Sequence, residues 1–92
     1  MTDLNKAVKL IVRGRVQKVG YRAFVLQKAI ELSVKGYVRN QSDGSVLVYA
    51  MGTNLQLDEF LQWCQSGSPL AKVNRLEVQL ATCNDRIDFR VE

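Results

Sequence analysis

Three stretches of the chain alternate apolar and polar residues in the way that a β-strand with one buried face does. Residues 8–13 and 73–80 are long enough for full strands, and residues 87–91 predict a short terminal strand. The residues of this last strand that we expect to face the core are Ile87, Phe89 and Val91. Both ends of the chain are therefore expected to supply strands to a sheet.

Two further strands are predicted in the middle of the chain, at residues 34–39 and 46–51. The segment between them, residues 40–45, contains the step Asp43-Gly44, which is a strong signal for a β-hairpin. We therefore expect these two strands to be antiparallel neighbours in one sheet.

Two helices are predicted from apolar residues that recur three and four positions apart. The first covers residues 21–32, with no proline to interrupt it. The second begins after Thr53, which can form a capping box with Gln56, and it stops at Gly67 and Pro69. The inward stripe of the second helix is Leu57, Phe60, Leu61 and Cys64.

The resulting order of elements is β-α-β-β-α-β, followed by the short fifth strand. A β-α-β unit brings its two strands parallel and places the helix on one face of the sheet. The order predicts an α+β fold, a ferredoxin-like split β-α-β sandwich with a mostly antiparallel sheet and two helices on one face. Since 92 residues suffice for one core, we expect a single domain over residues 1–92, with residues 1–7 as a loose N-terminal extension.

Composition and charge narrow the classes of function. The chain carries 13 Lys and Arg against 9 Asp and Glu, and this net charge of +4 favours an anionic partner without identifying one. Because the basic residues are spread along the chain, we expect no nucleic acid as a partner. The sequence has no secretory signal and no stretch of about 20 apolar residues, so we expect a cytoplasmic protein with no membrane partner.

The two cysteines, Cys64 and Cys83, lie in different segments and lack the spacing of a metal site. We expect Cys64 in the core of a helix and Cys83 near a loop, and a disulfide between them stays open at this point. Since the chain has no histidine, neither thiol is expected to act as an activated nucleophile.

The segment between the first strand and the first helix predicts a site for a small anion. Gly14 and Gly20 bracket it, and glycine lets a ligand approach the main chain without meeting a Cβ atom. The N–H groups from Arg15 to Gly20 can turn inward, and the helix adds about half a positive charge at its start. Arg22 lies in the first turn, where a cation opposes the helix dipole unless an anion lies between them. The alternative is a structural turn with a solvated arginine.

A second candidate for chemistry is Asn40, at the end of one predicted strand and the mouth of the hairpin. In the split β-α-β sandwich, the loop after the first strand can lie near this point. A side-chain amide offers a donor and an acceptor, so it could hold a water molecule without ionising. Asparagine before a turn is also common simply because it tolerates turn conformations.

Two motifs connect these features to a known family. Residues 14–22, Gly-Arg-Val-Gln-Lys-Val-Gly-Tyr-Arg, and residues 36–44, Gly-Tyr-Val-Arg-Asn-Gln-Ser-Asp-Gly, resemble the two signatures of the acylphosphatase family. Residues 67–73 also resemble the family's link between its second helix and fourth strand. The likeness extends from about residue 8 to residue 91.

The resemblance implies an acylphosphatase, a hydrolase that cleaves the carboxyl-phosphate anhydride of a small acyl phosphate to carboxylate and inorganic phosphate. It implies no metal and no cofactor, and we expect a monomer. In the family pattern, Arg22 matches the phosphate-binding arginine and Asn40 the asparagine that positions the attacking water. The residues expected to bind the phosphoryl group are Arg15, Val16, Gln17, Lys18, Val19, Gly20 and Arg22.

Two positions depart from the family pattern, because Lys18 and Ser33 stand where a glycine is usual. Lys18 brings the backbone freedom of the first loop into question. It leaves room for an alternative function, a non-catalytic phosphate- or anion-binding module of the same fold. A third possibility is an RNA-binding sheet, for which Tyr37, Tyr49 and Phe89 are the obvious strand aromatics.

The absence of histidine and of clustered acids suits an acyl phosphate as substrate. Its leaving group is a carboxylate whose acid has a pKa of about 4, so no general acid is needed. In a loose transition state little proton removal from water is needed either. An arginine, a loop of main-chain amides and one asparagine can supply the positioning that remains.

Overall fold

The computed structural model describes residues 5–92 of the chain. Strands and helices follow one another in the predicted order. Their bounds are β1 Lys6–Arg15, α1 Tyr21–Leu32, β2 Lys35–Asn40, β3 Val46–Gly52, α2 Asn54–Ser66, β4 Lys72–Ala81 and β5 Phe89–Val91. Each predicted element is thus present within a few residues of its expected bounds.

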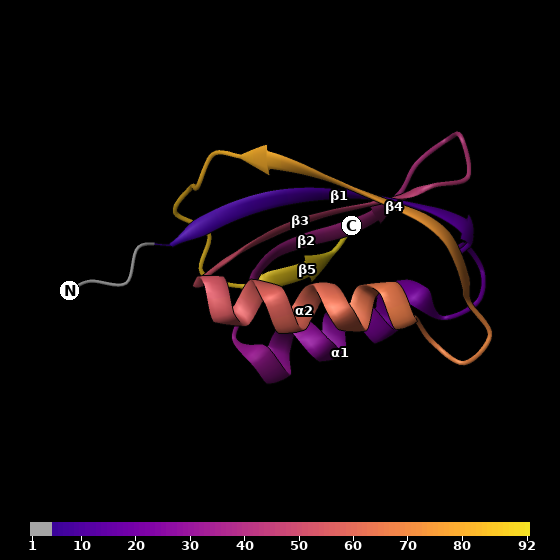
Figure 1. The fold of residues 1–92 in the computed structure, drawn as a ribbon, viewed down its shortest axis with the longest axis horizontal. Helices are drawn as coiled ribbons and strands as arrows, with labels where there is room; N and C mark the ends of the chain where they lie inside the picture. Colours follow the sequence, from indigo (N-terminus) through magenta and orange to yellow (C-terminus); the bar gives the residue numbers. More distant parts are fainter. Residues whose placement is uncertain (1–4) are drawn as a thin grey trace.

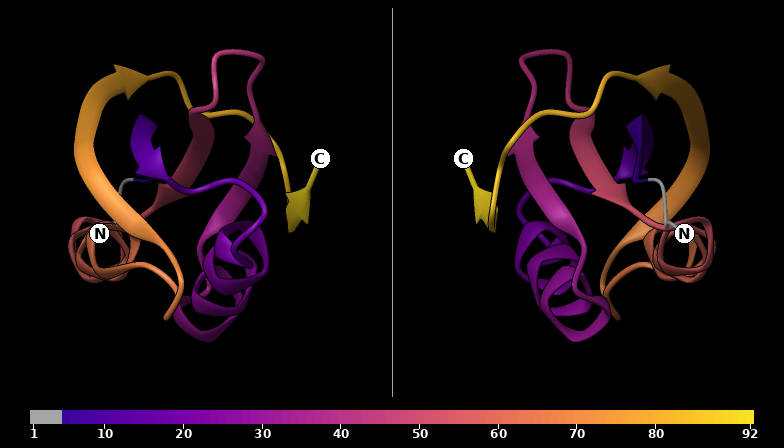
Figure 2. Two further views of the ribbon diagram at one scale, coloured as in Figure 1. Left: turned by 90° about the vertical axis from the view of Figure 1, so that its right-hand side faces the viewer. Right: turned by 90° about the vertical axis from the view of Figure 1, so that its left-hand side faces the viewer.

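The strands form one sheet in the order β4-β1-β3-β2-β5. The pairs β1–β3, β1–β4 and β2–β3 are antiparallel, and β2–β5 is parallel. Both helices lie on one face of the sheet (Figures 1 and 2), which confirms the predicted ferredoxin-like sandwich. Because β1 and β2 run in the same direction on either side of β3, the loops that follow them leave the same end of the sheet.

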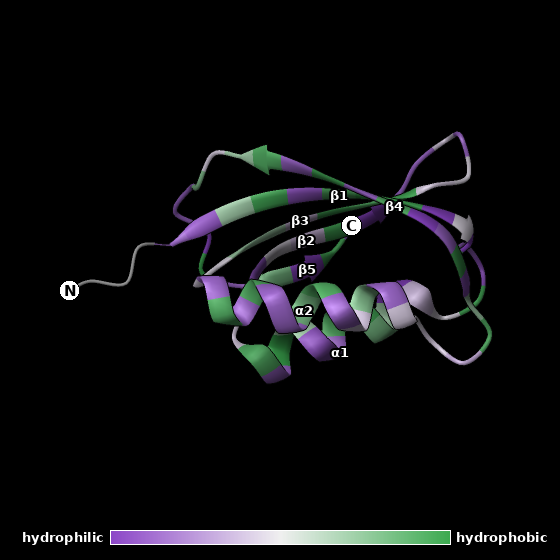
Figure 3. Ribbon diagram, in the orientation of Figure 1, coloured by the Kyte–Doolittle hydropathy of each residue, from purple (hydrophilic) through white to green (hydrophobic). Residues whose placement is uncertain are grey.

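The core lies between the sheet and the two helices. Leu10 and Val12 of β1 and Val48 of β3 are fully buried there. β3 is the central strand of the five, is largely apolar (Figure 3) and is buried along its whole length. Each helix contributes the stripe that its spacing predicts. The buried helical side chains are Tyr21, Val25 and Ala29 of α1, and Leu57, Phe60 and Cys64 of α2.

The end of α1 explains how Ser33 replaces a glycine. The N–H of Ser33 donates to the oxygen of Ile30 at 3.2 Å, and the N–H of Val34 donates to the oxygen of Ala29 at 2.8 Å. This is the Schellman pattern, which requires a left-handed residue, and Ser33 has φ 59°. The helix therefore ends where predicted, with a strained residue in place of the usual glycine.

The predicted capping box of α2 is confirmed. The hydroxyl of Thr53 accepts from the N–H of Gln56 at 3.2 Å, and the side chain of Gln56 accepts from the N–H of Thr53 at 2.8 Å. At the other end, the N–H of Gly67 donates to the oxygen of Trp63 at 2.9 Å. The connection to β4 thus begins at the same end of the sheet as the first loop.

The prediction for the last strand was wrong in one respect. Phe89 is buried, but Ile87 is 84% exposed and Val91 is 41% exposed. Phe89 pairs with Gly36, the second residue of β2, so Ile87 lies beyond the start of β2 and has no strand partner there. Val91 does pair with Val38, but β5 is an edge strand and Val91 remains partly exposed. The alternation therefore predicted inward residues correctly for one of three, because burial also depends on the neighbouring elements.

The expected N-terminal extension is shorter than residues 1–7. Lys6 and Ala7 belong to β1, and Ala7 pairs with Met51 and is buried. Residues 1–4 lie outside the described residues.

Cys64 and Cys83 are both free thiols, so the open question of a disulfide is settled. Cys64 is buried, and burial raises the pKa of its thiol to about 12, while Cys83 is exposed. As for membranes, none of the helices in residues 5–92 is long and apolar enough to span one.

Candidate active site

Three connections meet at one end of the sheet, on the right in Figure 1. They are the loop of residues 16–20 between β1 and α1, the hairpin loop of residues 41–45 between β2 and β3, and the link of residues 67–71 between α2 and β4. We call the first of these the phosphate loop and the second the hairpin loop. The sheet order alone brings them together, although they are far apart in the sequence.

The two glycines that bracket the phosphate loop are needed for different reasons. At Gly14, φ is 130° and a Cβ atom would lie 2.2 Å from the oxygen of Lys72, so the neighbouring strand excludes any side chain. At Gly20, φ is 77° and a Cβ atom would meet nothing within 4 Å. Gly20 therefore supplies the left-handed turn into α1 and leaves open space over the main chain.

Lys18 has a backbone conformation that favours glycine. Its φ is 62°, in the left-handed region, and its side chain is exposed. This conformation costs a non-glycine residue about 1–2 kcal/mol. The loop thus keeps its course at the price of local strain, and the lysine side chain adds a positive charge at its rim.

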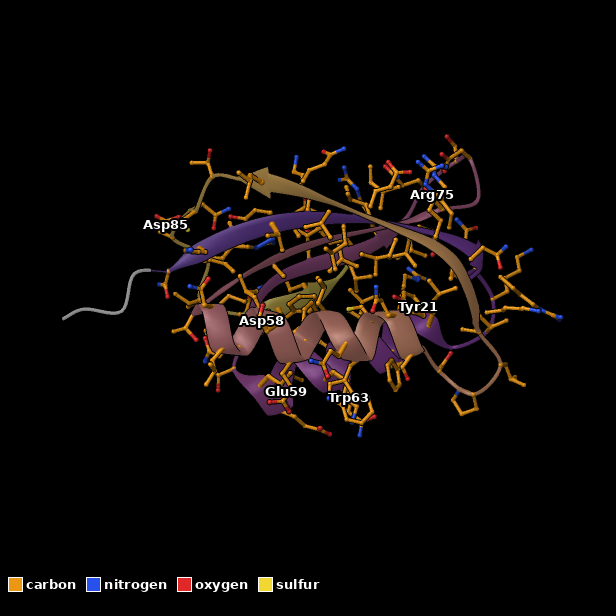
Figure 4. The ribbon with its side chains drawn as sticks, viewed as in Figure 1. Tyr21, Asp58, Glu59, Trp63, Arg75 and Asp85 are labelled. Atoms are coloured by element: carbon orange, nitrogen blue, oxygen red, sulfur yellow. The ribbon has the colours of Figure 1, made fainter. Side chains whose placement is uncertain are left out.

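The phosphate loop is anchored to the core by a buried side chain and by a hydrogen bond from the link between α2 and β4. Val16 is 1% exposed, and the hydroxyl of Ser68 donates to the oxygen of Val19 at 3.0 Å. The hydroxyl of Tyr21, labelled in Figure 4, donates to the oxygen of Cys64 at 2.7 Å and fixes the start of α1 against α2. Burial raises the pKa of Tyr21, so its hydroxyl stays protonated and keeps donating.

The start of α1 carries an uncompensated positive end. Its N-cap, Gly20, has no side chain to accept from the helix N–H groups, and the first turn contains no acidic residue. Arg22 lies in this turn and donates from Nη1 to the main-chain oxygen of Glu92 at 3.0 Å. The helix N-terminus and the guanidinium of Arg22 thus lie together without an acid in the first turn, which is an arrangement that favours an added anion.

Two hydrogen bonds of Glu92 connect Arg22 to β2, the strand that ends at Asn40. The N–H of Glu92 donates to the oxygen of Val38 at 2.8 Å, and the oxygen of Glu92 accepts from Arg22. Val38 is fully buried on the helix side of β2, and Asn40 is two residues further along the same face. The exposed side chain of Asn40 is therefore at the mouth of the sandwich, where α1 begins.

Gln17 joins the phosphate loop to the hairpin loop. Its side-chain nitrogen donates to the oxygen of Gln41 at 2.8 Å and to the oxygen of Ser45 at 2.8 Å. The sequence predicts Gln17 as a phosphate-binding residue and places Ser68 in the link between the second helix and the fourth strand, and it indicates neither of these hydrogen bonds. No local pattern signals either contact, because both partners are distant in the sequence.

The hairpin loop is held by its own side chains. The carboxylate of Asp43 accepts from the N–H of Ser45 at 2.9 Å and from its hydroxyl, and the other oxygen accepts from Arg13 at 3.1 Å. The hydrogen bond from the Ser45 hydroxyl, then that from its N–H, then that from Arg13 lower the pKa of Asp43 to about 2. The loop therefore carries an ionised carboxylate throughout the neutral range.

A pocket of about 280 Å³ opens between the phosphate loop, α1 and β5. Of the predicted phosphate-binding residues, it is lined by Val16, Lys18, Gly20 and Arg22, and its remaining wall includes Leu26 and Val91. The other predicted site residues are not part of its lining: Arg15, the last residue of β1, and Gln17, Val19 and Asn40. The pocket has cationic side chains and an apolar wall, which suits a small anion with an uncharged substituent.

A second and larger hollow, about 580 Å³, lies along α2 and is lined by residues such as Asp58, Glu59 and Trp63 (Figure 4). Its lining comes from α2 alone and includes two acids. It has none of the features of an anion site. Among residues 5–92, no group of three or more acids and cysteines is placed to hold a metal ion.

The fold and the first loop define a class: an α+β sandwich whose strand-to-helix turn can seat a small anion beside one arginine. The sequence model of the acylphosphatase family matches residues 8–91. The acylphosphatase of Archaeoglobus fulgidus is 46% identical over 85 residues, which cover 92% of this chain and 96% of that protein. The chain belongs to the acylphosphatase family, and it is a hydrolase of that class.

Solved structures agree with this assignment. The crystal structure of acylphosphatase from Bacillus subtilis matches with a TM-score of 0.92 at 33% identity, over 95% of this chain and 98% of that one. The structure of an acylphosphatase from Coxiella burnetii matches with a TM-score of 0.91 at 33% identity, over 96% and 93% of the two chains.

Proposed function

We propose that the chain hydrolyses acyl phosphates without a metal ion, with the phosphoryl group held by the phosphate loop and Arg22 and the attacking water positioned by Asn40. The observation that carries this proposal is the convergence of the three groups at one end of the sandwich. Arg22 and β2 contact the same residue, Glu92, and the side chain of Gln17 reaches the hairpin loop that follows Asn40.

The binding half of the site uses the main chain and one cation. N–H groups of the phosphate loop can donate to the phosphoryl oxygens, and the N-terminus of α1 adds its dipole. The guanidinium of Arg22 can exchange its single hydrogen bond to the main-chain oxygen of Glu92 for two parallel ones to the phosphoryl group. The stabilisation by these two hydrogen bonds is greatest in the transition state, when charge accumulates on the phosphoryl group. It therefore lowers the activation barrier of hydrolysis as well as the KM.

The hydrolytic half requires only that water be aligned. The carboxylate can leave without being protonated because its acid has a pKa of about 4. In a loose transition state the attacking water forms little bond to phosphorus, so it needs little activation by a base. The neutral amide of Asn40 can accept from the water with its oxygen and donate to a phosphoryl oxygen with its nitrogen. A phosphomonoester has a far poorer leaving group, and we expect weak turnover or none.

Lys18 does not favour the alternative of a non-catalytic anion-binding module. The doubt about this residue concerned backbone freedom, and Lys18 has the left-handed conformation, with φ 62°. The RNA-binding alternative has no specific support either. Tyr37 stacks on Tyr49 and lies beneath Arg39 and Arg86, while Tyr49 is buried and donates to the oxygen of Thr82, so both rings are engaged within the protein.

The proposal is tested by the release of benzoate from benzoyl phosphate, with a chelator present throughout. We expect full activity with the chelator and competitive inhibition by inorganic phosphate. Activity that appears only on adding Mg²⁺ or Zn²⁺ would contradict the metal-independent mechanism. 4-Nitrophenyl phosphate serves as the phosphomonoester control.

A further inference from the structure

We propose that the side chain of Gln17 is a positioning residue, which holds Asn40 in its catalytic position by fixing the hairpin loop to the phosphate loop. This inference rests on the function proposed above. It assigns to Gln17 a task beyond the main-chain contact with phosphate that its place in the loop predicts.

The geometry of the contact is specific. A side-chain amide nitrogen carries two hydrogens, and that of Gln17 donates to two carbonyl oxygens, each at 2.8 Å. These oxygens belong to Gln41 and Ser45, the first and last residues of the hairpin loop. The amide therefore closes the mouth of this loop from outside, and both of its donors are used there.

Asn40 is directly coupled to this closed mouth. It is the residue before Gln41, and it pairs with Val46, the residue after Ser45. If the carbonyl of Gln41 moved, the main chain next to Asn40 would move with it. If the carbonyl of Ser45 moved, the main chain next to Val46, the pairing partner of Asn40, would move. Asn40 is the last residue of β2 and its own side chain is exposed, so these hydrogen bonds supply a restraint that packing on its side chain does not.

Gln17 is also well anchored on the other side. It follows Val16, which is buried, and precedes Lys18, whose left-handed conformation turns the loop. Its main-chain N–H belongs to the proposed phosphate cradle. Gln17 would thus fix the distance between the attacking water and the phosphoryl group. When reacting groups must be aligned in this way, an error of about 1 Å can lower the rate about 100-fold.

We expect the fold to remain intact when the Gln17 amide is lost. The oxygen of Gln41 still accepts from the N–H of Gly44 at 3.2 Å, and the oxygen of Ser45 still accepts from the N–H of Gln41 at 2.8 Å. Neither carbonyl is left unpaired when the side chain is removed. A kinetic effect can therefore be separated from unfolding.

The test uses Gln17→Met, which keeps the length and removes both donors, and Gln17→Glu, which places a carboxylate against two carbonyl oxygens. We expect kcat on benzoyl phosphate to fall about 10- to 100-fold for both variants, while inhibition by inorganic phosphate changes less than about threefold for Gln17→Met, which adds no charge. Gln65→Met, on the exposed face of α2, makes the same chemical change away from the site and should leave both parameters unchanged. Thermal unfolding of each variant confirms that it is folded.

A double-mutant cycle with Asn40→Ala decides whether Gln17 acts through Asn40. We expect Gln17→Met to have little further effect on kcat in the Asn40→Ala background. An unchanged kcat for Gln17→Met, or two losses that multiply in full, would overturn the inference while leaving the roles of Arg22 and Asn40 in place. An unchanged kcat for Asn40→Ala alone would instead overturn the proposed role of Asn40, and with it this inference.

Discussion

The phosphate loop and the hairpin loop meet at the same end of the sheet, but they keep their shapes by different means. The phosphate loop is fixed from below, by the buried Val16 and by the hydrogen bond from Ser68 to Val19. The hairpin loop is fixed by polar side chains, those of Asp43 and Ser45 within it and that of Gln17 from the phosphate loop. One loop is thus held by the core of the protein and the other by hydrogen bonds from polar side chains.

This difference matches what each loop offers to a substrate. The phosphate loop offers main-chain N–H groups, so its side chains can vary as long as the backbone conformation is kept, as Lys18 illustrates. In the proposed mechanism, the hairpin loop serves to place one particular side chain, that of Asn40 at the end of β2. We therefore expect substitutions in the two regions to separate the binding of phosphate from its transfer to water.

Arg22→Ala should have the largest effect of any substitution at the site. Because Arg22 is the one side-chain cation in the first turn of α1, its loss should lower kcat/KM on benzoyl phosphate by about 100- to 1000-fold, and inhibition by phosphate should be lost together with activity. Arg90→Ala, an exposed arginine on β5 that pairs with Asp88, is the matched control. Substantial turnover by Arg22→Ala would remove Arg22 from the mechanism.

Asn40→Ala should affect the chemical step without the binding step. We expect kcat to fall about 100-fold through loss of water alignment, while phosphate inhibits the variant about as well as it inhibits the original protein. Asn54→Ala, at the exposed start of α2, controls for the chemical change. If phosphate affinity falls in parallel with kcat, Asn40 belongs to the binding half and the division between the two loops is wrong.

Asp43→Asn tests whether the hairpin loop depends on its carboxylate. The folded pKa of Asp43, about 2, is below its ordinary value of 3.8, so the ionised form contributes stability above about pH 4 and this contribution disappears as the pH falls towards 2. We expect the variant to be less stable at pH 7 and equal to the original protein near pH 2. Urea unfolding at a series of pH values measures this, and a difference that stays constant with pH would refute it.

Lys18→Gly should have the smallest effect. The substitution removes the strain of a non-glycine residue in the left-handed conformation, which stabilises the fold by about 1–2 kcal/mol. Glycine also increases the conformational entropy of the unfolded chain, which destabilises the fold by about 0.5–1 kcal/mol. We expect a net stabilisation of about 1 kcal/mol or less, measured by urea unfolding, with kcat unchanged. Ser33→Gly, which changes the same conformation at the end of α1, should stabilise similarly and leave kinetics untouched.

The charge of Lys18 is tested separately with Lys18→Asn, because asparagine tolerates the left-handed conformation and removes the cation. If the lysine attracts substrate at the rim, both Lys18→Gly and Lys18→Asn should raise KM modestly, and more so at low ionic strength. If the original protein and both variants have the same KM as one another, at low salt and again at high salt, only the backbone conformation matters at this position.

Most of the fold could be predicted because its signals are local. The Asp43-Gly44 step, the Thr53 capping box and the helical stripes each report on residues a few positions apart, and all are present in the structure. The error at Ile87 has the opposite origin. Its alternation with Phe89 and Val91 is local, but burial depends on whether β2 extends far enough to pair with it.

The site divides in the same way. The sequence by itself determined which groups are available for chemistry: a glycine-bracketed loop, Arg22 at a helix start, Asn40 before a hairpin, and no histidine. Only the tertiary structure decided that Arg22 contacts Glu92, that Ser68 anchors Val19 and that Gln17 spans the two loops. These contacts join residues brought together by the order of strands in the sheet, and no spacing along the chain encodes such a distance.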